Sequence, residues 1–155
     1  MPPLRDPNAH DLAAYAPEPV TVGYGGDVAG RGALGNQIAR LIGRVLRDAK
    51  DADIARQDVA RRMSERLGRQ VTIAQLDKWS SEAAQDRCIP LDAFAALIEA
   101  TGQHGALGFL PTLYGYAVVP ARYVDMIELQ MLEDHEQELA ARKAALQAKI
   151  KGHRR

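Results

Sequence analysis

The residues with the most evident chemistry lie between positions 56 and 79, where cationic and amide side chains precede a short amphipathic segment. Five side chains of the types that bind phosphate oxygens come first: Arg56, Gln57, Arg61, Arg62 and Arg69. Three side chains of the types that hydrogen bond to base edges follow at three-residue spacing: Thr72, Gln75 and Lys78. Because guanidinium groups suit phosphate and amide groups suit bases, this set indicates binding to double-stranded DNA.

Two short helices must position these side chains. The apolar stripe of residues 54–67 predicts a helix that ends at Gly68, and Thr72 is placed to cap a second helix that buries Ile73, Leu76 and Trp79. The small Ala60 permits a close crossing, as in a helix-turn-helix. Residues 64–71 are more than a tight turn needs, so either the first helix extends to Leu67 or the loop bulges.

The other apolar periods predict an all-α fold. We expect a helix up to Lys50 with Asn36 as its N-cap, a helix that Pro90 opens and Thr101-Gly102 ends, and one turn at 107–110 that Pro111 interrupts. Proline and glycine dominate the start of the chain. The expected organisation is a flexible arm (1–35), a helix-turn-helix domain (36–112), an extended connector (113–120) and a long helix (121–151).

The long helix carries apolar residues at alternating steps of three and four: Leu129, Leu132, Leu139, Leu146 and Ile150. Glu136 and Lys143 interrupt this ladder, which permits a coiled coil but weakens it. Two interpretations stay open. The helix either joins copies of the chain into a homo-oligomer or packs back on the domain.

The charge balance of the chain conceals a basic block. The whole sequence has 20 Lys and Arg residues against 20 Asp and Glu residues, a net charge of zero. Residues 31–79 contain eleven bases against six acids, whereas residues 80–141 contain two bases against ten acids. A basic block between acidic flanks is typical of a DNA-binding surface, and a merely solvated helical surface is the alternative.

Other chemistry finds little support. Cys88 is the one cysteine, and the four histidines show no pair at metal-ligand spacing, so we expect no metal site. Gly23–Gly30 resembles a nucleotide-binding loop, but Val28 stands where the third glycine should be, which favours a mobile tether. We also expect no cofactor, no small-molecule substrate, no catalytic set and no membrane span, and a cytoplasmic location.

The pattern between Gln37 and Gly102 is similar to a known family. The matching segments are Val59-Ala60-Arg61-Arg62-Met63-Ser64, Val71-Thr72, Leu76-Asp77-Lys78-Trp79, Ile89-Pro90-Leu91 and Ala100-Thr101-Gly102. They resemble the small helix-turn-helix regulators of Mu-like transposable phages and prophages. The resemblance implies a lambda-repressor-like domain that acts in early phage transcription.

The sequence thus predicts a sequence-specific DNA-binding transcriptional regulator that is not an enzyme and that assembles as a homo-oligomer. An alternative is a protein-interaction adaptor, in which the long helix carries the function and the basic block is ordinary surface.

Overall fold

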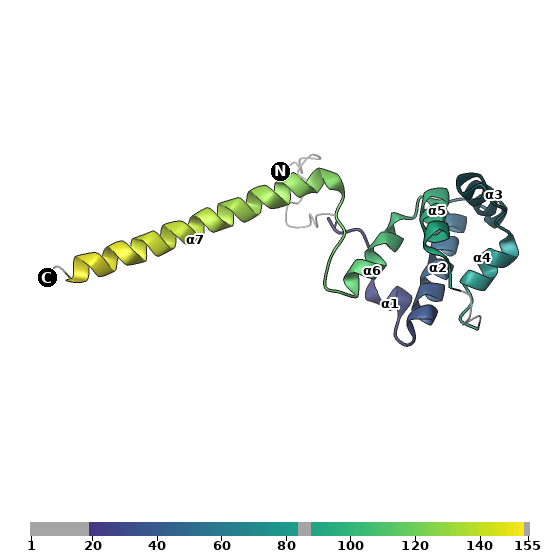
Figure 1. The fold of residues 1–155 in the computed structure, drawn as a ribbon, viewed down its shortest axis with the longest axis horizontal. Coiled ribbons are helices and arrows are strands. Elements are labelled where there is room, and N and C mark those ends of the chain that lie inside the picture. The colour runs from purple at the N-terminus through teal and green to yellow at the C-terminus, as the bar shows by residue number, and fades with distance from the viewer. Residues whose placement is uncertain (1–18, 84–87, 154–155) are drawn as a thin grey trace, which may run out of the picture.

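The structure is a computed structural model that describes residues 19–83 and 88–153. In these ranges the chain is helical, with one isolated antiparallel bridge between Val22 and Val118, so the predicted all-α class is confirmed. The elements are α1 (Gly26–Ala29), α2 (Leu34–Asp51), α3 (Arg56–Leu67), α4 (Ile73–Trp79), α5 (Leu91–Thr101), η1 (His104–Gly108), α6 (Phe109–Thr112), η2 (Ala121–Tyr123) and α7 (Val124–His153). Elements α1 to α6 form a helical domain, and α7 extends away from it (Figure 1).

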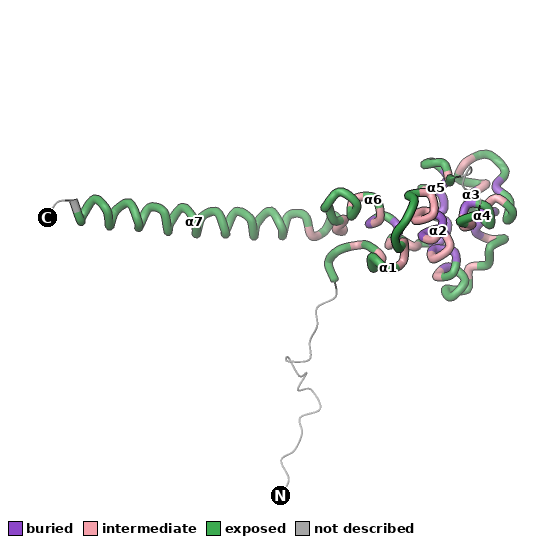
Figure 2. The backbone as a smooth tube through the Cα atoms, turned by 90° about the horizontal axis from the view of Figure 1, so that it is seen from below, coloured by how far each residue is buried: buried purple, intermediate pink, exposed green. Residues whose placement is uncertain are grey.

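The core lies between α2, α3 and α5, with α4 closing one side. Helix α2 supplies the largest share of buried apolar side chains: Leu41, Ile42, Val45 and Leu46. Val59 and Met63 of α3 and Leu97 of α5 are fully buried against them. Trp79, at 8% exposure, lies in this core, as the spacing in α4 predicted. The prediction that Ile73 is buried on the same face was wrong, because this first residue of α4 is 37% exposed. Figure 2 shows the buried residues gathered in the helical domain and none along α7.

The helix ends follow local chemistry with two exceptions. Gly68 and Gly102 end α3 and α5 in the left-handed conformation, with φ of +63° and +68°, and Thr72 caps α4, as predicted. The prediction that Asn36 caps the first helix was wrong. Its backbone N–H donates to the Ala33 carbonyl, so the helix starts earlier. Pro111 also does not interrupt α6, because a proline in the first turn of a helix needs no N–H partner.

Residues 19–35 are packed, which corrects the prediction of a flexible arm for this part; residues 1–18 lie outside the described ranges. Helix α1 contacts α2, and the Val22 N–H donates to the Val118 carbonyl at 2.7 Å, which also fixes the expected extended connector. The Arg40 guanidinium donates to the Ala29 and Arg31 carbonyls, both at 2.6 Å. These hydrogen bonds hold the segment on the helical domain.

The packing of this segment depends on Gly108. A Cβ atom there would lie 2.7 Å from Gly23 Cα and closer still to the Val22 carbonyl oxygen, both of them backbone atoms that cannot rotate away. We therefore expect Gly108→Ala to lower the free energy of unfolding by about 1–3 kcal/mol, as overpacking does. Urea denaturation measures the change. Gly26→Ala is the matched control, because its Cβ meets nothing within 4 Å, and equal stability of the two variants would contradict the packing described.

Candidate nucleic-acid interface

Helices α3 and α4 form a packed pair at the end of the helical domain away from α7 (Figure 1). Leu76 and Trp79 of α4 are buried, and α3 presents Val59, Ala60 and Met63 to the interior. Ala60 is only 6% exposed, in agreement with its predicted role at the helix crossing. The pair therefore has one buried face and leaves the other side of α4 open to solvent.

Ser64 fixes the turn between the two helices. Its hydroxyl donates to the Ala60 carbonyl at 2.7 Å and accepts from the Val71 N–H at 2.8 Å. Of the two possibilities that the sequence left open, α3 extends to Leu67 and the chain returns through Gly68. Sequence reasoning missed Ser64, although a serine within a helix often bonds the carbonyl four residues before it.

A capping box holds the start of α4. The Gln75 N–H donates to Thr72 Oγ1 at 3.2 Å, and the Thr72 N–H donates to Gln75 Oε1 at 2.9 Å. Thr72 and Lys78 are exposed, whereas Gln75 is half-buried because its side chain bends back. Gln75 is one of the three predicted base-reading residues. Because its Oε1 atom accepts from Thr72, only its side-chain NH2 group is available to donate a hydrogen bond to a base.

All four of the predicted phosphate-binding arginines already have intramolecular partners. Arg56 pairs with Asp77, Arg61 pairs with Glu65 at 3.0 Å and with Asp58 at 3.4 Å, and Arg69 pairs with Asp92 at 2.8 Å. Arg62 donates to the Ala100 carbonyl at 3.0 Å. The hydrogen bond from Arg69 also holds the pKa of Asp92 below its ordinary value. Gln57 is exposed in the first turn of α3.

The surface is therefore a mixed network of cations and acids rather than an open basic patch. The partners of Arg61 are three and four residues away on the same helix and can be read from the sequence. Asp92, and Glu99 beside Arg66, come from α5, and no local pattern reveals such long-range pairs. Lys78 is exposed and, within the described residues, has no such partner.

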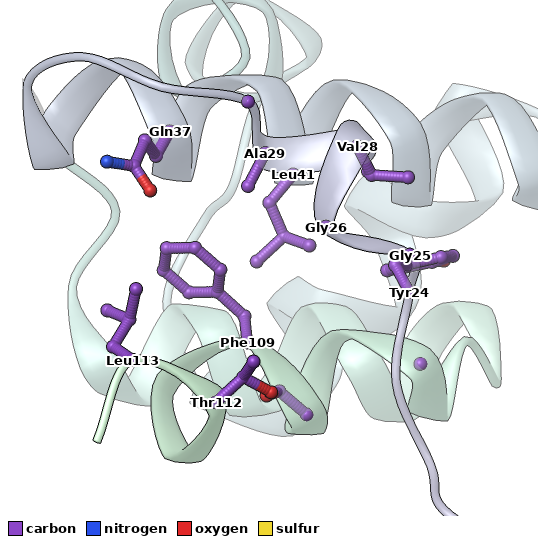
Figure 3. Close-up of a pocket in the computed structure, with 13 residues that line it drawn as sticks. Tyr24, Gly25, Gly26, Val28, Ala29, Gln37, Leu41, Phe109, Thr112 and Leu113 are labelled. Atoms are coloured by element: carbon purple, nitrogen blue, oxygen red, sulfur yellow. The ribbon is translucent and has the colours of Figure 1, made fainter. Parts of the chain in front are cut away.

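A second candidate site is a cavity of about 140 Å³ between α1, α2 and α6. Figure 3 shows Leu41 and Phe109 pointing into it, with the backbone of Gly25 and Gly26 along one side. Among the described residues that line it, Tyr24 has a titratable group, and none is a lysine, an arginine or a carboxylate. Its lining suits apolar packing rather than phosphate, and the predicted mobile tether is in fact its wall.

The comparisons add no further guide to the site. Protein-family models, curated proteins and solved structures give no significant match to the chain. In the described ranges, no group of three or more His, Cys, Asp or Glu residues is arranged to hold a metal ion. No described helix is both long and apolar enough to cross a membrane.

The turn offers a direct test. Ser64→Ala leaves the Val71 N–H without its acceptor, and we expect the free energy of unfolding to fall by about 1–2 kcal/mol. Ser80→Ala is the matched control, since the Ser80 hydroxyl makes one exposed bond, to the Asp77 carbonyl, and its loss is expected to cost under about 0.5 kcal/mol. Urea denaturation compares them, and a Ser64→Ala variant as stable as its control would show that the hydroxyl does not fix the turn.

Tyr24 provides a pH-dependent signal. Burial, and then the neighbouring Asp48 carboxylate, raise its pKa from 10.0 to about 12, although no described residue forms a hydrogen bond with the buried hydroxyl. Because the folded state favours the neutral phenol, the stability from Tyr24 is present below pH 10 and is lost as the pH rises toward 12. We expect a phenolate absorbance component that titrates near pH 12 and disappears in Tyr24→Phe. Loss of a component near pH 10 instead would contradict the burial of this hydroxyl.

Proposed function

We propose that the chain is a sequence-specific DNA-binding regulator in which α3 and α4 act as a helix-turn-helix and α4 enters the major groove. One observation carries the proposal: α4 buries Leu76 and Trp79 while Thr72, Ala74 and Lys78 stay exposed on its outer side. A short helix that is fixed at its start and open along one side is the part that such proteins insert into DNA.

The ion pairs of α3 are compatible with phosphate binding. Exposed pairs such as Arg56 with Asp77 contribute between about 0 and 1 kcal/mol, so a phosphate can replace the carboxylate at little cost. Arg56, Arg61 and Arg69 bind phosphates in this way, and Gln57 adds a neutral donor at the start of α3. Arg62 remains on Ala100 and contributes through its charge.

The regulatory part of the proposal comes from the similarity of residues 37–102 to the helix-turn-helix regulators of Mu-like phages. It implies action on early phage transcription inside a bacterial host. The proposed partner is double-stranded DNA, with no cofactor and no catalytic reaction.

DNA binding is tested with a site selected from random double-stranded DNA, titrated at several salt concentrations. Lys78→Gln should weaken binding and make the log-log salt slope about 0.9 shallower, because one phosphate or base-edge contact loses its charge. Asp77→Asn should act in the opposite direction, since it frees Arg56 and removes a negative charge from the outer side of α4. Fluorescence anisotropy measures both changes.

Lys151→Gln is the control, because it removes the same charge from the far end of α7 and should leave affinity unchanged. Affinity that ignores salt, or equal effects of Lys78→Gln and Lys151→Gln, would refute the assigned interface. An Arg61→Ala/Arg62→Ala variant that binds normally would do so as well.

A protein-interaction adaptor is the second candidate, and the exposed length of α7 favours it. The full chain and a chain that ends at Arg122 separate the two functions. DNA affinity in both chains supports the regulator, whereas no DNA affinity in either chain, together with partner binding that requires α7, supports the adaptor.

A further inference from the structure

Helix α7 leaves a row of apolar side chains in solvent. Its seam residues are each between 52% and 58% exposed: Leu129, Leu132, Leu139, Leu146 and Ile150. Figures 1 and 2 show that nothing in the described chain covers the helix, so it does not pack back on the helical domain. Five large apolar residues in one heptad pattern are a surface for another helix.

The charges of α7 are divided between its two halves. Residues 124–141 contain six acids and no base, whereas residues 142–153 contain four bases and no acid. The helix dipole favours this order, but its effect is confined to the first and last turns. Glu136 and Lys143 lie in the middle of the helix and about 10 Å apart along its axis, too far to pair with each other. Their placement on the apolar seam needs another reason.

We propose that two copies of the chain pair through α7 as an antiparallel coiled coil. In a parallel pair, Glu136 would face Glu136 of the second copy and Lys143 would face Lys143, which sets like charges against each other inside the seam. In an antiparallel pair, the acidic half of each helix lies along the basic half of the other. Matching the centres of the two halves places the two-fold axis near Ala141.

In an antiparallel coiled coil each layer pairs a residue of one seam column with a residue of the other column. This register therefore pairs Leu132 with Ile150 of the second copy and places Glu136 within one helical turn of Lys143 of the second copy. Each α7 is about 45 Å long, so the two helical domains lie at opposite ends of the pair. The pairing does not depend on DNA binding, since α3 and α4 lie at the other end of the domain (Figure 1).

Cysteine trapping in the full chain tests the orientation. In a Cys88→Ser background, Leu132→Cys and Ile150→Cys chains of different mass are mixed and oxidised by air. Antiparallel pairing gives the mixed 132–150 disulfide and little of either symmetric product. Symmetric products in excess, or a monomer at about 100 μM in sedimentation equilibrium, would overturn the proposal.

A charge reversal tests the cause. Glu136→Lys should weaken self-association by about tenfold or more, because it removes the attraction inside the seam and adds repulsion to the basic half of the second copy. Glu136→Lys/Lys143→Glu should restore it. Glu138→Lys is the control, since it makes the same charge change outside the seam. Equal weakening by Glu136→Lys and Glu138→Lys would overturn the proposal, whereas loss of DNA binding alone would leave it intact.

Discussion

The contact between α3 and α5 is the constraint on which the candidate interface depends. Helix α3 buries few apolar side chains, chiefly Val59 and Met63, and its polar side adds bonds to α5. Arg62 reaches the Ala100 carbonyl and Arg66 pairs with Glu99 at 2.7 Å. Because these bonds fix the direction of α3, they also fix the position of α4, which follows the turn at the end of α3. Arg62, which the sequence assigned to DNA, therefore also has a structural role in the packing of α3 on α5.

Helix boundaries could be predicted wherever they depend on local chemistry. Gly68, Thr72 and Gly102 end or begin helices through their own backbone freedom or their own hydroxyl. The packing of residues 19–35 could not be predicted, because it depends on contacts across the chain. Gly108 lies some eighty residues after the segment that packs against it. Neither the hydrophobic periodicity nor the composition of the sequence indicates that the two are in contact. A glycine-rich sequence is compatible with a loose tether and with a close backbone contact, and composition alone does not distinguish the two.

The same distinction applies to the candidate site. The cap at Thr72 and the buried positions of Leu76 and Trp79 were predicted from the sequence and are confirmed. The basic character of the block was overestimated, because Asp92 and Glu99 belong to the acidic segment and return to neutralise Arg69 and Arg66. A count of charges along the sequence does not show which charges lie close together in the folded chain. A fold that brings the two segments together cancels much of that field within a few ångströms.

Helix α7 differs from the candidate site, because no tertiary contact within the described chain stabilises it. Its residues are good helix formers, and its thirty-residue length offsets the cost of nucleation that makes short isolated helices marginal. Such a helix forms from local preference and still leaves Leu132, Leu139 and Leu146 in water, a state that the proposed pairing would relieve. Because the helix points away from α4, this pairing would leave the candidate DNA surface open. Two domains held about 45 Å apart would then exceed the spacing of one DNA turn, roughly 34 Å, so an antiparallel pair favours separated half-sites or two DNA segments over one compact operator.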